Sequence, residues 1–170
     1  MERWVNLIMK KILIISVTDK SNLILAKRIK ELFELQTEII TLEDYPLPLY
    51  TGKSKLKDQT VINDLCEKII SANGFVFCGP EYNGGSAPIL TNAITWISVT
   101  TDYWRDAFTD KIGLIATHSG GNGNSFFSTF KQQLEFLGMV VFPRSIIVNK
   151  NKDFSVESSK KIIERFQNLL

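Results

Sequence analysis

The most distinctive stretch of the sequence is a loop that reads Gly79-Pro80-Glu81-Tyr82-Asn83-Gly84-Gly85. Pro80 fixes the chain where it leaves an apolar run. Gly84 and Gly85 lack Cβ atoms, so they permit positive φ and the close approach of a flat ligand. Tyr82 offers an aromatic face, and Asn83 offers both a hydrogen-bond donor and an acceptor. A proline-glycine loop is usually just a turn, but this one is longer and more specifically ordered than a turn requires.

A second stretch has the composition of an anion site, and it reads Ser16-Val17-Thr18-Asp19-Lys20-Ser21-Asn22. It precedes a predicted helix, and a helix N-terminus presents free backbone N–H groups and a positive dipole end to a phosphate. Thr18, Lys20, Ser21 and Asn22 add side-chain donors. The same residue types are favoured at any helix start, so an ordinary capping loop explains them equally well. Asp19 opposes a phosphate, because a carboxylate close to a dianion costs free energy unless it points away.

A third stretch is rich in glycine and reads His118-Ser119-Gly120-Gly121-Asn122-Gly123-Asn124-Ser125. Its glycines suit a wall that accommodates a ligand. His118 has no visible partner for acid–base catalysis, so we interpret it as a satisfied loop histidine. Glu81 is interpreted in the same way, as a structural acceptor rather than a general base. We therefore predict no catalytic acid or base.

Alternating apolar strands and amphipathic helices position these three loops. Strands are predicted over residues 11–17, 37–42, 75–78, 111–117 and 140–148, with a kink or an edge position at Pro143. Helices are predicted around residues 25–33, 61–70, 87–98, 125–137 and 162–170. This order of elements predicts a doubly wound parallel sheet of five strands with helices on both faces; if the strand order is 2-1-3-4-5, strands 1 and 3 flank the point where the order reverses. The three loops then emerge at its carboxyl edge, where open α/β sheets bind ligands.

Composition excludes several classes of protein. The 170 residues are 44% hydrophobic and 22% charged, which supports a folded core. Twenty Lys and Arg against 18 Asp and Glu are too balanced for a nucleic-acid footprint. Cys66 and Cys78 lack metal-site spacing and are expected to be buried, reduced thiols. Without a secretory leader or a membrane span, which needs about 18 apolar residues, we expect a cytoplasmic protein with no membrane contact.

A family resemblance follows from the motif of the 79–85 loop together with later segments. These are Pro88, Asn92-Ala93, Trp96-Ile97-Ser98, Thr117-His118-Ser119-Gly120-Gly121 and Leu137-Gly138-Met139. In this setting the sequence resembles the NADPH-dependent FMN reductases of flavodoxin-like fold, which include azo-dye, quinone and chromate reductases. The resemblance implies a single flavodoxin-like FMN-binding domain over residues 10–170, preceded by an N-terminal extension over residues 1–9. It also implies a three-layer α/β sandwich.

The resemblance further implies which residues hold the cofactor. The FMN phosphate would lie against Ser16, Thr18, Lys20, Ser21 and Asn22. The isoalloxazine ring would be bordered by Pro80, Glu81, Tyr82, Asn83, Gly84 and Gly85, and closed on its other side by Ser119, Gly120 and Gly121. NADPH or NADH would donate hydride to the ring, which would then reduce a flavin, quinone, azo compound or similar small acceptor.

Some features depart from the family or leave alternatives open. Ser16-Val17 replaces the usual Gly-Ser, Asp19 stands near an arginine position, and the loop is one residue shorter. These departures support a degenerate member that acts as a binding module without flavin. A flavodoxin-like electron carrier is the other alternative, although such carriers are strongly acidic.

The family also implies a homodimer or homotetramer. Trp96, Tyr103 and Trp104 suit either an interface beside the flavin or ordinary core packing. The stretch 47–50 suits either a lid over the pocket or plain loop packing.

Overall fold

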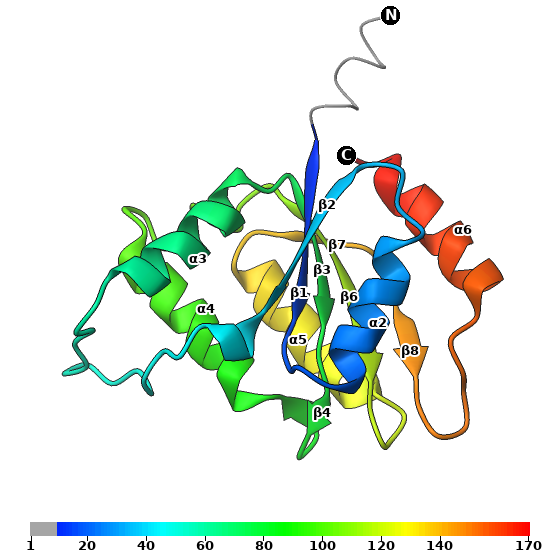
Figure 1. Ribbon diagram of the computed structural model, residues 1–170, viewed down its shortest axis with the longest axis horizontal. Helices are drawn as coiled ribbons and strands as arrows, with labels where there is room; N and C mark the ends of the chain where they lie inside the picture. The colour runs from blue at the N-terminus through cyan, green and yellow to red at the C-terminus, as the bar shows by residue number, and fades with distance from the viewer. Residues whose placement is uncertain (1–9) are drawn as a thin grey trace, which may run out of the picture.

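A parallel sheet forms the centre of the computed structural model, which describes residues 10–170 (Figure 1). The predicted extension, residues 1–9, lies outside these residues. The strands of the main sheet are β1 (Lys11–Ser16), β2 (Gln36–Thr41), β3 (Gly74–Cys78), β6 (Ile112–His118), β7 (Val140–Val141) and β8 (Ile146–Val148). Their order is β2-β1-β3-β6-β7, with β8 also paired to β6. This confirms the predicted order and the flavodoxin-like class.

The fifth strand position differs from the sequence prediction. Instead of one strand over residues 140–148, β7 pairs with the start of β6 and β8 pairs with its end. Pro143 lies between them, and a proline has no N–H to donate to a ladder. The chain therefore leaves β6 after Phe142, whose N–H still bonds the Gly113 carbonyl at 2.8 Å, and returns at Ile146.

Within residues 10–170, five α-helices cover the sheet, three on one face and two on the other (Figure 1). They are α2 (Ser21–Lys30), α3 (Thr60–Ser71), α4 (Pro88–Thr100), α5 (Asn124–Phe136) and α6 (Val156–Gln167). A short 3₁₀ turn, η1 (Leu42–Asp44), follows β2. Helices α3, α4 and α5 pack in one hydrophobic cluster, and α2 and α6 pack in the other.

The central strands are apolar over most of their length because both of their faces are covered. In β1, Leu13 and Ile15 contribute to the cluster of α3, α4 and α5, whereas Ile12 and Ile14 contribute to that of α2 and α6. In β3, Phe77 lies in the first cluster and meets Phe130 of α5 edge-on, with ring centroids 5.0 Å apart. Successive side chains of a strand point to opposite faces, so a continuous aliphatic run fills both clusters.

The carboxyl ends of β1, β3 and β6 lie at one edge of the sheet, the lower edge in Figure 1. The register confirms it, because Ser16 is level with Cys78, and Cys78 is level with Ala116. The three loops singled out in the sequence therefore leave the sheet side by side. Gly79 permits α5 to approach this edge, since a Cβ there would lie 2.9 Å from both Phe126 and Val17.

Residues 10–170 offer neither a membrane-spanning helix nor a cluster of metal ligands. No helix in this part of the chain is both long and apolar enough to cross a membrane. The same residues contain no group of three or more His, Cys, Asp or Glu side chains that could hold a metal ion.

Candidate functional site

The three loops surround one cavity of about 300 Å³ at the carboxyl edge. Its wall includes nearly all of the predicted first-loop residues and parts of the other two loops. The lining residues are Thr18, Asp19, Lys20, Ser21, Asn22, Glu43, Pro80, Glu81, Tyr82, His118, Ser119 and Gly120. Among the predicted site residues, those outside this wall are Ser16, Asn83, Gly84, Gly85 and Gly121. Glu43 was not predicted from the sequence, and His118 was interpreted only as a satisfied loop residue.

The first loop, residues 16–22, presents free backbone donors to this cavity. Helix α2 begins at Ser21 without a side-chain cap and with no acidic residue in its first turn. Within residues 10–170, the N–H groups of Lys20, Ser21 and Asn22 have no hydrogen-bond acceptor. Uncapped N–H groups and the positive end of the helix dipole favour an anion at this place.

Two predicted phosphate ligands of the first loop have their side chains engaged elsewhere. The buried Ser16 hydroxyl donates to the Thr18 carbonyl at 2.7 Å, so it shapes the loop from within. The Asn22 amide donates to the His118 carbonyl at 3.1 Å and accepts from the His118 N–H at 2.9 Å. Thr18, Lys20 and Ser21 therefore supply the side chains of this loop that are available to a ligand.

The second loop, residues 79–86, is a miniature hairpin. Strands β4 (Glu81–Tyr82) and β5 (Gly85–Ser86) pair antiparallel around Asn83 and Gly84, whose φ values are 49° and 73°. Positive φ at both central residues characterises the tight type I′ hairpin turn, for which Asn-Gly is the preferred sequence. Of the two glycines that permit positive φ, only Gly84 adopts it: Gly85 is paired in β5, and Asn83 takes the left-handed conformation. A Cβ atom at Gly85 would meet nothing within 4 Å, so space is open beside the hairpin.

Glu81 joins the second loop to the third. Its carboxylate accepts hydrogen bonds from the N–H groups of Ser125 (2.9 Å) and Phe126 (3.1 Å), and so caps α5. Its own N–H donates to the Ser119 hydroxyl at 2.8 Å. The interpretation of Glu81 as a structural acceptor is confirmed. A carboxylate at a helix N-terminus is stabilised by the unpaired N–H groups and the dipole.

The third loop, residues 118–125, has a buried anchor and an exposed rim. The Ser119 hydroxyl is hydrogen-bonded to that of Thr117 at 2.7 Å, and the Ser119 N–H donates to the Val148 carbonyl at 3.1 Å. Gly120 and Gly121 are exposed, and only Gly120 lines the cavity. Ser119 therefore fixes the loop, while Gly120 presents backbone to the cavity.

Glu43, in η1, places a carboxylate on the first loop. Its Oε2 atom accepts a hydrogen bond of 2.5 Å from the Asp19 N–H. No motif signals this contact in the sequence. The one available signal was position, because a residue that directly follows β2 must lie at the same edge as the other loops.

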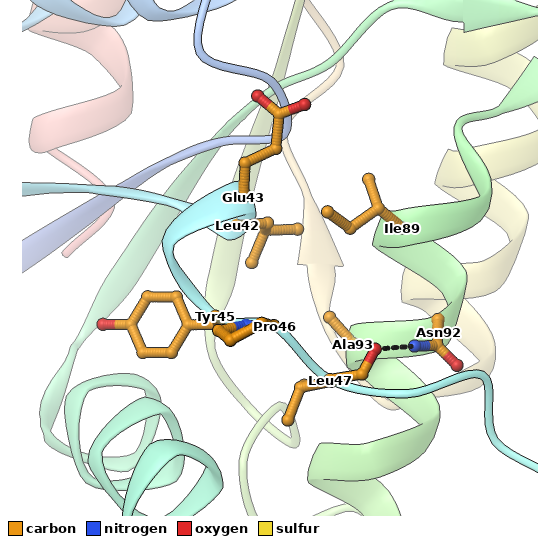
Figure 2. A pocket seen from close by; sticks show the side chains of 8 residues that line it. All are labelled: Leu42, Glu43, Tyr45, Pro46, Leu47, Ile89, Asn92 and Ala93. Atoms are coloured by element: carbon orange, nitrogen blue, oxygen red, sulfur yellow. Dashed lines mark hydrogen bonds between the residues drawn. The ribbon is translucent and has the colours of Figure 1, made fainter.

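A second, smaller cavity of about 160 Å³ shares Glu43 with the first (Figure 2). Its lining consists of Leu42, Glu43, Tyr45, Pro46, Leu47, Ile89, Asn92 and Ala93. In Figure 2 the Glu43 carboxylate points away from Leu47 and Asn92. Burial, followed by a hydrogen bond to Asp64, raises the pKa of the Tyr45 phenol, so this phenol is neutral at neutral pH.

The stretch 47–50 is fastened to α4 by side-chain hydrogen bonds. Asn92 donates to the carbonyls of Leu47 (3.4 Å, Figure 2) and Pro48 (3.1 Å), and accepts from the Tyr50 N–H at 2.8 Å. The Trp96 indole N–H donates to the Pro48 carbonyl at 2.7 Å, and the residue is 5% exposed. Loop packing explains this stretch, and core packing explains Trp96.

Comparison with known proteins agrees with this geometry. The family model described as NADPH-dependent FMN reductase matches residues 9–153. An NAD(P)H-dependent FMN reductase of Schizosaccharomyces pombe is 35% identical over 105 residues, which are 57% of this chain and 49% of that protein. An NADPH azoreductase of Bacillus sp. (strain OY1-2) is 28% identical over 100 residues, which are 59% of this chain and 52% of that protein. The match thus spans about half the length of these curated relatives.

A solved structure extends the likeness in fold to most of the chain. The flavoenzyme NAD(P)H:(acceptor) oxidoreductase FerB from Paracoccus denitrificans superposes with a TM-score of 0.76 at 19% identity, covering 94% of this chain and 96% of that one. The family match over residues 9–153 includes all three loops of the cavity. On these grounds the chain belongs to the NADPH-dependent FMN reductase family.

Proposed function

We propose that this protein is an NAD(P)H-dependent oxidoreductase that uses FMN to pass electrons from a nicotinamide nucleotide to a small acceptor. The observation that carries the proposal is the meeting of three loops in one cavity, with an uncapped helix start at one end and a tight hairpin at the other. Family membership supports the same assignment.

The residues of the cavity fit the two ends of FMN. The N–H groups of residues 20–22, with the side chains of Thr18, Lys20 and Ser21, would hold the phosphate. The open space beside the hairpin at Gly85 and beside the third loop at Gly120 would receive the ring, since a Cβ at either glycine meets nothing within 4 Å. Asp19 and Glu43 work against a phosphate, but neither blocks the N–H groups of residues 20–22.

FMN, when bound, supplies the hydride-transfer chemistry of its ring, and the protein's part is binding and orientation. The hairpin of the second loop would border the ring and fix its angle to the sheet. Backbone N–H groups around the ring would stabilise negative charge on it. Tyr82 is 50% exposed at the cavity wall and would limit water beside the ring.

The acceptor and the assembly state belong to the same proposal. A flavin, a quinone or an azo compound is the acceptor class that we infer, because it would meet the same exposed ring face as the nicotinamide. We also propose a homodimer or homotetramer, supported by the exposed aromatic side chains of Tyr103, Trp104 and Phe136. Light scattering on a size-exclusion column measures the assembly directly, and a monomeric mass would refute it.

Reconstitution tests the central proposal. Purified protein is incubated with FMN, freed of excess flavin, and examined by visible absorption before and after NADPH or NADH is added. We expect a flavin spectrum that bleaches with the nucleotide and returns when a quinone is supplied.

The same experiment separates the alternatives. Flavin uptake without oxidation of either nucleotide would indicate a flavodoxin-like electron carrier. A protein that takes up no flavin would indicate a binding module, the alternative that the carboxylates of Asp19 and Glu43 favour.

A further inference from the structure

Glu43 occupies a backbone donor of the loop that we assign to the flavin phosphate. Its carboxylate accepts the Asp19 N–H at 2.5 Å, immediately before the uncapped start of α2. Glu43 also lines the cavity. A side-chain anion therefore occupies the backbone donor next to the N–H groups of residues 20–22, which would hold the phosphate.

The charges around this end of the cavity are unfavourable for a second anion. Two residues that line this end, Asp19 and Glu43, carry a carboxylate, and one, Lys20, carries an ammonium group. Like charges at such short range repel, and a phosphate that carries almost two negative charges is repelled most. A flavin without a phosphate would not meet this repulsion.

We propose that Glu43 is an internal competitor of the flavin phosphate, which lowers the preference of the site for FMN over riboflavin and keeps FMN exchangeable. This inference rests on the proposed function and adds a specificity-determining residue to it. For the phosphate to take the Asp19 N–H, the Glu43 carboxylate must give up this bond and turn away.

The simpler explanation of the contact is that Glu43 only tethers the first loop. The two explanations predict opposite signs. If Glu43 is a tether, its removal leaves the first loop less ordered, so the phosphate binds more weakly. If Glu43 is a competitor, removal of its carboxylate leaves the Asp19 N–H available and less negative charge in the cavity, so the phosphate binds more tightly.

The test compares binding of FMN and riboflavin by quenching of flavin fluorescence at low ionic strength. Glu43→Gln keeps a side-chain oxygen that can accept the Asp19 N–H but removes the charge. We expect it to tighten FMN about tenfold, which corresponds to about 1.4 kcal/mol, and to leave riboflavin unchanged. Glu43→Ala is expected to tighten FMN as well.

Asp44→Asn is the matched control. Asp44 neighbours Glu43 in the same 3₁₀ turn but does not line this cavity, so its variant removes an equal charge without freeing the loop. We expect it to bind both flavins as the unmodified protein does. Weaker or unchanged FMN binding in Glu43→Gln, or an equal gain for riboflavin, would overturn the inference.

A titration with inorganic phosphate makes the inference independent of flavin binding. Amide NMR signals of residues 19–22 report phosphate at the loop. We expect them to shift at lower phosphate concentration in Glu43→Gln than in the unmodified protein. Absence of flavin binding together with this shift would reject the proposed function alone, whereas an unchanged titration would reject the competition.

Discussion

The side-chain amide of Asn22 bonds both backbone groups of His118, although the two residues are 96 positions apart. Asn22 is 2% exposed and stands in the first turn of α2, and His118 ends β6. A single side chain thus fastens the first loop to the third. This accounts for a buried asparagine at a position where the sequence predicted a phosphate ligand.

Replacing Asn22 with Ala tests this link. The His118 N–H and carbonyl would lose their partner, and an unsatisfied buried polar group costs about 1–3 kcal/mol. We expect the free energy of unfolding to fall by this amount in urea denaturation. Asn63→Ala, at an exposed position of α3, is the control and should leave stability nearly unchanged. Equal urea midpoints for Asn22→Ala and Asn63→Ala would show that the hydrogen bonds between Asn22 and His118 contribute no net stability.

The cap that Glu81 forms on α5 gives a second prediction. Glu81→Ala leaves the N–H groups of Ser125 and Phe126 without their acceptor, at a cost of about 1 kcal/mol, as for other lost helix caps. Both amides should exchange with solvent faster in hydrogen-exchange NMR. Glu81→Gln retains a side-chain oxygen and should recover part of this protection. If exchange at these amides stays slow in Glu81→Ala, the cap is not what protects them.

Substitutions at two glycines distinguish an effect on stability from an effect on flavin binding. Gly79→Ala forces a Cβ against Phe126 and Val17, and we expect a loss of stability of about 1–3 kcal/mol from overpacking. At Gly120 an added Cβ meets nothing within 4 Å, so Gly120→Ala should unfold at the same temperature as the unmodified protein. Flavin binding should weaken in Gly120→Ala, because the methyl group enters the space that we assign to the ring. A Gly120→Ala variant with unchanged flavin affinity would place the ring elsewhere.

Both cysteines should be unreactive in the folded protein. Burial raises the pKa of the Cys66 thiol to about 11, and full burial also raises that of Cys78. Burial favours the neutral form of a thiol over the thiolate. At pH 8 only about one Cys66 thiol in a thousand is therefore ionised. Iodoacetamide should therefore modify neither residue rapidly until guanidinium unfolds the chain. Mass spectrometry after a short exposure checks this, and equal labelling of folded and unfolded protein would contradict it.

Much of the architecture was predictable from local patterns. The aliphatic run of β1 and the Phe75–Cys78 segment each bury both faces, and this is what a parallel strand requires. The order of elements then fixed the edge at which the three loops emerge. The fifth strand was harder to predict, because its apolar residues continue through Pro143 while its hydrogen bonds do not.

The cavity was predictable in its loops but not in its contacts. The Asn83-Gly84 pair carried the signal of a tight hairpin, but the sequence interpretation assigned these residues only to the binding of a flat ligand. The role of Glu43 depends on how β2 and β1 lie side by side, and no spacing within the sequence encodes that distance. Similarly, nothing local shows that Asn22 turns toward His118 rather than toward a ligand.

The links among the loops have a thermodynamic consequence. Asn22, Ser119 and Glu81 each bond the backbone of another loop, or of the helix that follows it, so the loops are held together by the chain itself. A ligand that enters such a preorganised edge loses its own freedom but orders little of the protein. Its affinity is then governed by the contacts it makes and the anion it displaces, and not by the folding of a disordered rim.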